Sequence, residues 1–288
     1  MNTRNKIKTD YHVHPDYSPD AAPFQVRDYC EKALDLGLRE ICFTTHLDID
    51  PVREHLDNYV FLNGKKHPVR DLIWLDKYVE EILAARKEFA GHNLKVKTGI
   101  EVSYVPGLEK EIETILLTYP FDFVLGGIHT LDHIDLSWDR ECHLYFGRHS
   151  LEQIKKDYFS TLREAVQTKL FDCIAHLDIY KRYGIKFHGP EILTIHRDVV
   201  EPILEEMAQN NSGLEINTSS LRKGMDDFLP SREIIALAAQ AGVKIFTVGS
   251  DAHHLDDLGA QVEDALQLLQ ELGLNNHVFN QRKPSPCL

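Results

Sequence analysis

Six histidines and three carboxylates lie at or just beyond the ends of seven apolar, strand-like segments of this 288-residue chain. Imidazole and carboxylate groups are the ligands that zinc, manganese and iron take in proteins. One ion needs three or four such groups, so nine are too many for a single mononuclear site. If they converge, they would hold two or three divalent ions, and such a centre is suited to hydrolysis. The nine residues are His12, His14, Asp20, His46, Glu101, His129, His176, Asp251 and His253.

Two pairs of these residues are separated by a single position. Alternate side chains of a strand share a face, so His12 and His14 can reach one ion, and Asp251 and His253 have the same spacing. Glu101 ends an apolar strand, where an unpartnered buried carboxylate would be costly, and it could bridge two ions. Taken singly, each group is more often a satisfied polar residue than a ligand. Their number at strand ends favours a metal centre.

The elements that must position these residues alternate between strand and helix. The seven predicted strands are 9–14, 40–46, 95–102, 121–129, 171–176, 213–218 and 244–250. The helical stretches are 24–36, 69–90, 108–118, 151–168, 191–209, 230–241 and 256–272. This alternation predicts a parallel sheet in an α/β fold. Because ligands come from the first, middle and last strands, a closed or nearly closed barrel with its site at the C-terminal mouth is preferred to an open sheet.

The rest of the chain predicts one domain, residues 1–288, without a linker or low-complexity tract. Loops 47–68 and 130–150 leave the predicted mouth and are long enough to be lids or specificity elements, or decoration without a catalytic role. No apolar run is long enough to span a bilayer, and the five scattered cysteines favour a reducing, cytoplasmic location. A net charge of −13 argues against nucleic acid as the main partner. No feature indicates an oligomeric state.

The ordered motifs resemble the polymerase and histidinol phosphatase (PHP) superfamily from about Lys8 to about Leu272, and most closely its histidinol-phosphate phosphatases. The subgroup resemblance rests on the opening Asp10-Tyr11-His12-Val13-His14, the segment that begins at Ala175-His176 and runs to Arg182, and the chain length. The resemblance implies a distorted seven-stranded (β/α)7 TIM-like barrel with a metal centre at the C-terminal mouth.

The same resemblance implies three ions and divides the ligands among them. The first would take His12, His14, Glu101 and Asp251, the second Glu101, His129 and His176, and the third Asp20, His46 and His253. Some members of the superfamily have histidine where this chain has Asp20. An aspartate there shifts the preference toward harder ions, so zinc, manganese and iron all stay open.

The expected chemistry is attack on phosphorus by a hydroxide held between two ions, with Glu101 and Asp251 as the catalytic carboxylates. Asp251 is interpreted as a ligand, and a proton-relay role is left open. Arg182 and Arg222 follow the fifth and sixth strands and are the candidates for phosphate binding, against the alternative of arginines bound to nothing. His254 adjoins a ligand and is a candidate substrate contact. In the long loops, Asp48, Asp132 and Trp138 are candidates for binding a cationic substrate.

The predicted function is metal-dependent hydrolysis of a small phosphorylated metabolite, L-histidinol phosphate, in histidine biosynthesis as the resemblance implies. A broad-specificity phosphomonoesterase or a nucleotide phosphodiesterase with the same centre is the nearest alternative. A non-catalytic metal-binding accessory or regulatory module is an alternative of another class. An amidohydrolase is a third alternative, but such barrels commonly bridge their metals with a carboxylated lysine, whereas Glu101 is available here.

Overall fold

The computed structural model describes residues 8–287 and contains all seven predicted strands. The observed strands are β1 (Thr9–Val13), β2 (Glu40–Phe43) with its continuation β3 (His46–Leu47), β6 (Lys95–Ser103), β7 (Phe123–Gly127), β10 (Cys173–Ile174), β11 (Gly213–Asn217) and β12 (Phe246–Gly249). They are mostly shorter than predicted. The second is interrupted at residues 44–45, and β3 resumes the pairing with His46 opposite Glu101.

The strands form a nearly closed parallel barrel. Hydrogen bonding follows the order β1, β2, β6, β7, β10, β11, β12, so each strand neighbours the next strand of the barrel along the chain. The first and last strands meet beyond β12, where Val13 bridges Ala252 in parallel and the Ser250 amide donates to Asp10 Oδ1 at 2.9 Å. This closure brings the C-terminal ends of the first and last strands together, as the ligand pattern requires.

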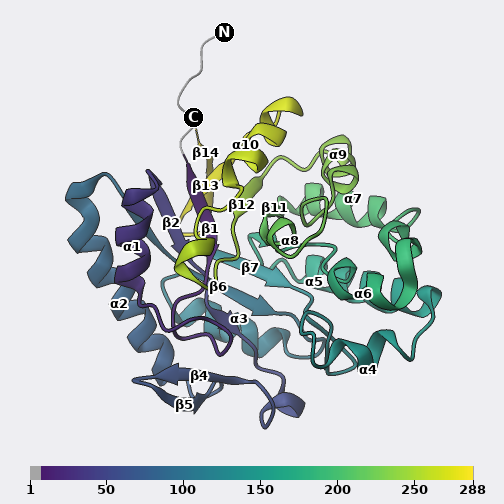
Figure 1. Cartoon of the computed structure of the whole chain (residues 1–288), viewed down its shortest axis with the longest axis horizontal. Coiled ribbons are helices and arrows are strands. Elements are labelled where there is room, and N and C mark those ends of the chain that lie inside the picture. The colour runs from purple at the N-terminus through teal and green to yellow at the C-terminus, as the bar shows by residue number, and fades with distance from the viewer. Residues whose placement is uncertain (1–7, 288) are drawn as a thin grey trace.

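Amphipathic helices cover the outside of the barrel (Figure 1). The long connecting helices are α1 (Val26–Asp35), α2 (Ile73–Phe89), α3 (Glu109–Thr118), α5 (Leu151–Thr168), α7 (Val200–Asn210), α9 (Arg232–Ala241) and α10 (Val262–Glu271). Each corresponds to a predicted helical stretch. The prediction of one helix over 191–209 is wrong in its first half, because a 3-10 helix (Gly189–Thr194) and a turn precede α7.

The two long loops contain structure of their own. Loop 47–68 holds a 3-10 turn (Pro51–Arg53) and the hairpin β4 (Tyr59–Leu62) and β5 (Lys65–Pro68). Loop 130–150 holds the hairpin β8 (Thr130–Leu131) and β9 (Ile134–Asp135) and the short helix α4 (Cys142–Phe146). The β4–β5 hairpin and α4 both lie along the lower edge of the view in Figure 1. Short helices α6 (Lys181–His188) and α8 (Ser219–Arg222) follow β10 and β11.

A C-terminal hairpin, β13 (His277–Asn280) and β14 (Lys283–Pro286), covers the opposite end of the barrel. Phe279 packs against Phe123 with ring centroids 4.7 Å apart, and Arg282 pairs with Asp172 just before β10. The hairpin therefore closes the N-terminal ends of the strands and leaves the C-terminal mouth as the open end. Among residues 8–287, no helix has the length and apolar character needed to cross a bilayer.

Candidate metal centre

The nine predicted ligands meet at the C-terminal mouth, and Glu101 lies at their centre. Its side chain is fully buried on β6. Five imidazole nitrogens surround its two carboxylate oxygens: those of His176 at 2.8 Å, His46 at 3.0 Å, His12 at 3.1 Å, His129 at 3.2 Å and His14 at 3.5 Å. One carboxylate facing five imidazoles is suited to bridge adjacent cations, as the sequence analysis expects.

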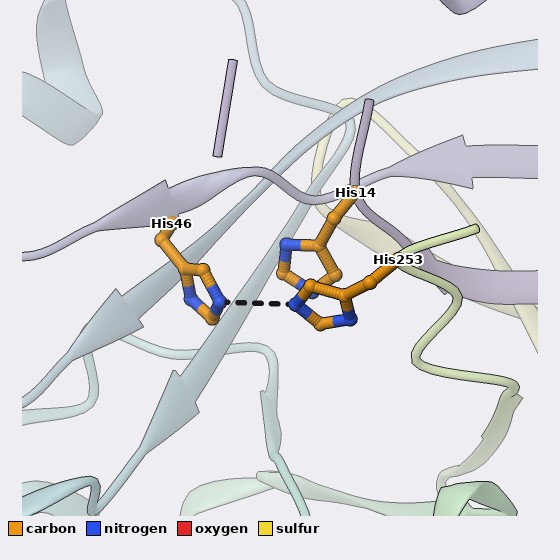
Figure 2. A group of neighbouring side chains, drawn as sticks. All are labelled: His14, His46 and His253. Atoms are coloured by element: carbon orange, nitrogen blue, oxygen red, sulfur yellow. Dashed lines mark hydrogen bonds between the residues drawn. The ribbon is translucent and has the colours of Figure 1, made fainter. Parts of the chain in front are cut away.

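Asp251 and Asp20 approach the same histidines from the last strand and the first loop. Asp251 Oδ1 lies 3.5 Å from His14 Nε2 and 3.4 Å from His253 Nδ1. Asp20 Oδ2 lies 3.1 Å from His253 Nε2, at a more exposed edge of the cluster. In Figure 2 the rings of His14 and His253 lie against each other beside His46. The centroids of the His14 and His253 rings are 4.1 Å apart.

Four triads of ligand atoms are compact enough to hold an ion. They are His12, His14 and Asp251; His12, Glu101 and His176; His14, His46 and His253; and His46, Asp48 and His129. The first triad belongs to the ligand group expected for the first ion. The second triad contains Glu101 and His176 of the group expected for the second ion, with His12 added from the first group. The third triad contains His46 and His253 of the group expected for the third ion, but His14 replaces Asp20. The fourth triad adds Asp48, which the sequence analysis did not include among the ligands.

Unpaired buried atoms test whether this cluster fits metal ions. His12 Nε2, His14 Nε2, His46 Nδ1 and Glu101 Oε2 are buried, face one another, and have no hydrogen-bond partner of acceptable geometry. Each such group costs about 1–3 kcal/mol when it is left unsatisfied. A set of converging nitrogen and oxygen donors is satisfied by divalent cations. The residues present therefore fit a polynuclear centre of divalent metal ions.

The protonation of the cluster without metal is mixed. Burial lowers the pKa of His12 and His46, but Glu101 outweighs burial and holds both pKa values well above their usual range, so these imidazoles would lose protons when metal binds. The carboxylates of Glu101 and Asp251 and the imidazole of His14 are already in metal-binding states. Burial raises the pKa of Glu101, but the neighbouring imidazoles, first of all His12, outweigh burial and hold that pKa well below its usual range. The pKa of Asp251 is also well below its usual range, since His12 and His14 outweigh its burial. Burial lowers the pKa of His14 well below its usual value. Both carboxylates are thus ionised and His14 is neutral, which are the states that ligate metals.

Backbone geometry at the site is unusual at two ligands. His176 has φ of 27° and Asp251 has φ of 55°, both in the left-handed region that non-glycine residues seldom adopt. Strain of this kind persists where the surrounding structure holds it, often at functional sites. Gly127 gives space to the same rings, because a Cβ there would lie 2.9 Å from the His129 ring and 3.0 Å from the His176 ring.

The sequence analysis missed two residues that orient the ligands. Glu215 Oε1 lies 2.6 Å from His12 Nδ1, and Glu215 Oε2 accepts a hydrogen bond from the His176 amide at 2.9 Å. Ser103 Oγ lies 2.5 Å from His129 Nδ1. Hydrogen bonds to the far nitrogen fix the tautomer and orientation of a ligating histidine. Glu215 was detectable, because it is a carboxylate inside an apolar strand, the same signal that identified Glu101.

A pocket of about 400 Å³ opens over the cluster and is cationic on one side. Both predicted arginines line it, together with Lys223, which the sequence analysis missed. Arg182 Nη2 donates to Ser219 Oγ at 2.7 Å and lies 3.6 Å from Asp251 Oδ2, while its Nε is buried and unpaired. Arg222 Nη2 donates to the Ser250 carbonyl at 2.8 Å, and its Nη1 is unpaired. Arg222 Nε also lies 3.1 Å from Asp257 Oδ1, so both guanidinium groups are held in place beside the pocket.

Two residues predicted to contact substrate lie elsewhere. His254 is not among the residues that line this pocket: its ring packs edge-on against Phe24 at 5.0 Å, and its Nδ1 accepts a hydrogen bond from the Asp256 amide. The chain turns after His253, so the adjacent side chain points away from the mouth. Asp132 is exposed at the tip of the β8–β9 hairpin and does not line the pocket either.

Comparison with known proteins agrees with the predicted family and fold. A barrel with several histidines around a buried carboxylate at its mouth is typical of metal-dependent hydrolases, and the PHP domain model matches residues 10–219. The chain belongs to the PHP domain family, which confirms the predicted resemblance. A probable histidinol-phosphatase of Deinococcus radiodurans is 30% identical over 90% of this chain and 92% of its own length.

Two further comparisons extend over nearly the whole chain. The histidinol-phosphatase of Lactococcus lactis is 26% identical over 93% of this chain and 92% of its own length. A crystal structure of the Lactococcus lactis histidinol phosphate phosphatase with zinc, L-histidinol and phosphate superposes with a TM-score of 0.77. That comparison has 23% identity and covers 97% of this chain and 99% of the other. It confirms the predicted barrel fold.

Proposed function

We propose that this protein is a metal-dependent phosphomonoesterase that hydrolyses L-histidinol phosphate to L-histidinol and phosphate. The observation that carries the proposal is the convergence of five imidazoles on the buried Glu101, beside a pocket lined by Arg182, Arg222 and Lys223. The substrate is supported by relatives named histidinol-phosphatase and by the Lactococcus lactis protein, whose structure contains L-histidinol and phosphate.

Some side chains around the pocket can bind the phosphate, and others position the binding groups. Arg182 and Arg222 line the pocket and can bind the phosphate oxygens through their guanidinium groups, and Lys223 adds a third positive charge. Asp251 contacts both His14 and Arg182, so it couples the ligand cluster to the phosphate pocket. When bound, divalent ions would lower the pKa of a coordinated water toward neutrality, so that it could act as a nucleophile, and would neutralise phosphate charge.

The centre holds two or three divalent ions in this proposal. The ligand donors are imidazoles and carboxylates without cysteine, a set that suits zinc, manganese or iron. His12, His14, Glu101 and Asp251 are the best-supported ligands, since they are buried and carry unpaired or closely opposed donor atoms. A reducing, cytoplasmic location is part of the same proposal and is supported by five free cysteines.

The test is turnover of L-histidinol phosphate by protein whose metal content has been measured. Removal of metal with a chelator is expected to abolish phosphate release, and addition of zinc, manganese or ferrous iron is expected to restore it. Rates with p-nitrophenyl phosphate and a nucleoside phosphodiester measured in parallel should be lower than the rate with L-histidinol phosphate.

Each other outcome identifies an alternative. Equal rates on all phosphomonoesters would favour a broad-specificity phosphatase, and faster cleavage of the diester would favour a phosphodiesterase. Metal-loaded protein that hydrolyses none of these esters would contradict the proposal and favour a binding or regulatory module.

A further inference from the structure

A second pocket lies beside the phosphate pocket. It has a volume of about 390 Å³ and is formed mainly by loops 47–68 and 130–150. Asp20, His46, His129 and Ser137 line both pockets, so the two spaces adjoin across the candidate metal ligands. A molecule with its phosphate beside Arg182 could therefore extend its other end into the second pocket.

The two pockets differ in charge when the candidate metal ligands are set aside. Five carboxylates line the second pocket, against the two arginines Arg53 and Arg140; the carboxylates are those of Asp20, Asp48, Asp50, Asp57 and Asp135. Arg53 is already neutralised, because it pairs with both Asp57 and Glu141. The phosphate pocket carries two arginines and a lysine beside four carboxylates, and three of these, Asp20, Glu101 and Asp251, are candidate metal ligands. The combined space is thus cationic at one end and anionic at the other, which complements a substrate with a phosphate and a positive charge.

Asp135 is the carboxylate of this pocket that is best placed to bind a cation. It lies in β9 opposite Thr130, the residue that follows the candidate ligand His129. Its Oδ1 accepts hydrogen bonds from the Ser137 amide at 2.6 Å and from Ser137 Oγ at 2.7 Å. Within the described part of the chain it forms no ion pair, whereas Asp50 and Asp57 are paired with His133 and Arg53. Asp135 is partly buried, and Arg53 acts on its charge. Because Arg53 is already paired with Asp57 and Glu141, a cationic ligand can supply a counter-charge.

Aromatic side chains form another wall of the pocket. Trp138 is 40% exposed, and the Arg140 guanidinium lies 5.7 Å from its ring centroid, so the ring already interacts with a cation. Tyr59 lines the pocket as well. Aromatic faces attract cationic and planar groups. An anionic pocket with aromatic walls is suited to an ammonium or imidazolium group.

An ion-pair network around the buried Arg53 joins the two loops and holds the pocket in shape. The Arg53 guanidinium donates to the His133 carbonyl at 2.8 Å and to Glu141 Oε1 at 2.7 Å. His133 Nδ1 lies 2.6 Å from Asp50 Oδ2. These contacts join loop 47–68 to loop 130–150. The anionic wall is therefore formed in advance of binding, which reduces the entropy cost of recognition.

We propose that this second pocket selects phosphomonoesters whose alcohol half carries a positively charged nitrogen, and that Asp135 is its specificity-determining residue. The inference rests on the proposed function and deepens it, since it assigns the recognition of the cationic half to residues outside the metal centre. The phosphate is held at the cationic end, and the ammonium or imidazolium group lies between Asp135 and Trp138.

The test compares Asp135→Asn with wild type on three phosphomonoesters. They are L-histidinol phosphate, its analogue without the amino group, and the neutral aromatic ester 2-phenylethyl phosphate. Asparagine keeps the shape and the acceptor oxygen for Ser137 but removes the charge. For L-histidinol phosphate, kcat/KM is expected to fall about 10- to 100-fold, because a hydrogen bond to a charged group is lost. For 2-phenylethyl phosphate, kcat/KM should change less than about 3-fold.

The matched control is Glu54→Gln, which removes one charge from the exposed surface of loop 47–68. It is expected to leave kcat/KM unchanged on all three esters. A loss that persists with the analogue assigns Asp135 to the imidazolium group, and a loss confined to L-histidinol phosphate assigns it to the ammonium group. An equal loss on all three esters, or none on any, overturns the inference.

Calorimetric binding of L-histidinol separates this inference from the proposed function. Wild type should bind L-histidinol more tightly than Asp135→Asn by a similar factor. If wild type hydrolyses no phosphomonoester but shows this difference in binding, the proposed function fails and the pocket assignment stands. If wild type hydrolyses L-histidinol phosphate and Asp135→Asn is unaltered in both assays, only the pocket assignment fails.

Discussion

Replacing Glu101 with glutamine is expected to lower kcat on L-histidinol phosphate by about 100- to 1,000-fold and to reduce the number of bound metal ions per chain. Glutamine has nearly the same shape, but it lacks the negative charge that faces five imidazole nitrogens at 2.8–3.5 Å. A neutral amide cannot bridge two cations as a carboxylate can. Metal analysis of the purified variant and steady-state phosphate release measure the two effects.

The control for this variant is Glu113→Gln, on the exposed face of α3. It makes the same chemical change and should alter neither metal content nor rate. Normal metal content and normal kcat in Glu101→Gln would remove Glu101 from the centre. A normal metal content with a reduced rate would instead assign Glu101 a catalytic role without a bridging role.

The second large effect is expected at Arg182. Replacement by alanine should lower kcat/KM for L-histidinol phosphate by about 100-fold or more, because a guanidinium near a transferring phosphoryl group stabilises its developing charge. Its Nε is buried and unpaired, and its Nη2 is 3.6 Å from Asp251. Metal content should stay unchanged, which separates a phosphate-binding role from a structural one.

Two further variants sharpen this prediction. Arg182→Lys keeps the charge but lacks the planar fork, so it should recover only part of the lost activity. Arg163→Ala removes an arginine that pairs with Glu206 on the exposed surface of α5, and it should behave as wild type. Loss of metal together with loss of activity in Arg182→Ala would show that Arg182 supports the ligand cluster.

The convergence of the nine candidate ligands could be predicted from the sequence, because residues at the ends of parallel barrel strands lie at one mouth. Any residue just past a parallel strand lies at the same mouth, whatever its distance along the chain. His12 and Asp251 are therefore neighbours at 3.6 Å although 239 positions separate them. Most predicted strands extend beyond the observed ends, because candidate ligands such as His129 and His176 follow the regular pairing, whereas Glu101 lies within β6.

The parts that the sequence analysis missed depend on contacts between loops. Asp135 and Arg53 have no periodic signal, and their roles come from the way loops 47–68 and 130–150 fold against each other. His254 shows the converse error, because adjacency in sequence to His253 did not carry it into the pocket once the chain turned. The split of the second strand at residues 44–45, which sets His46 opposite Glu101, also had no sequence signal.

The most direct measurement is anomalous diffraction at the zinc, manganese and iron absorption edges from crystals of the metal-loaded protein. We predict two or three anomalous peaks at coordination distance from the donor atoms around Glu101, with at least one peak contacting both Glu101 and His12. A metal-loaded crystal without any peak within the reach of Glu101, or with a single peak held elsewhere on the surface, would contradict the account.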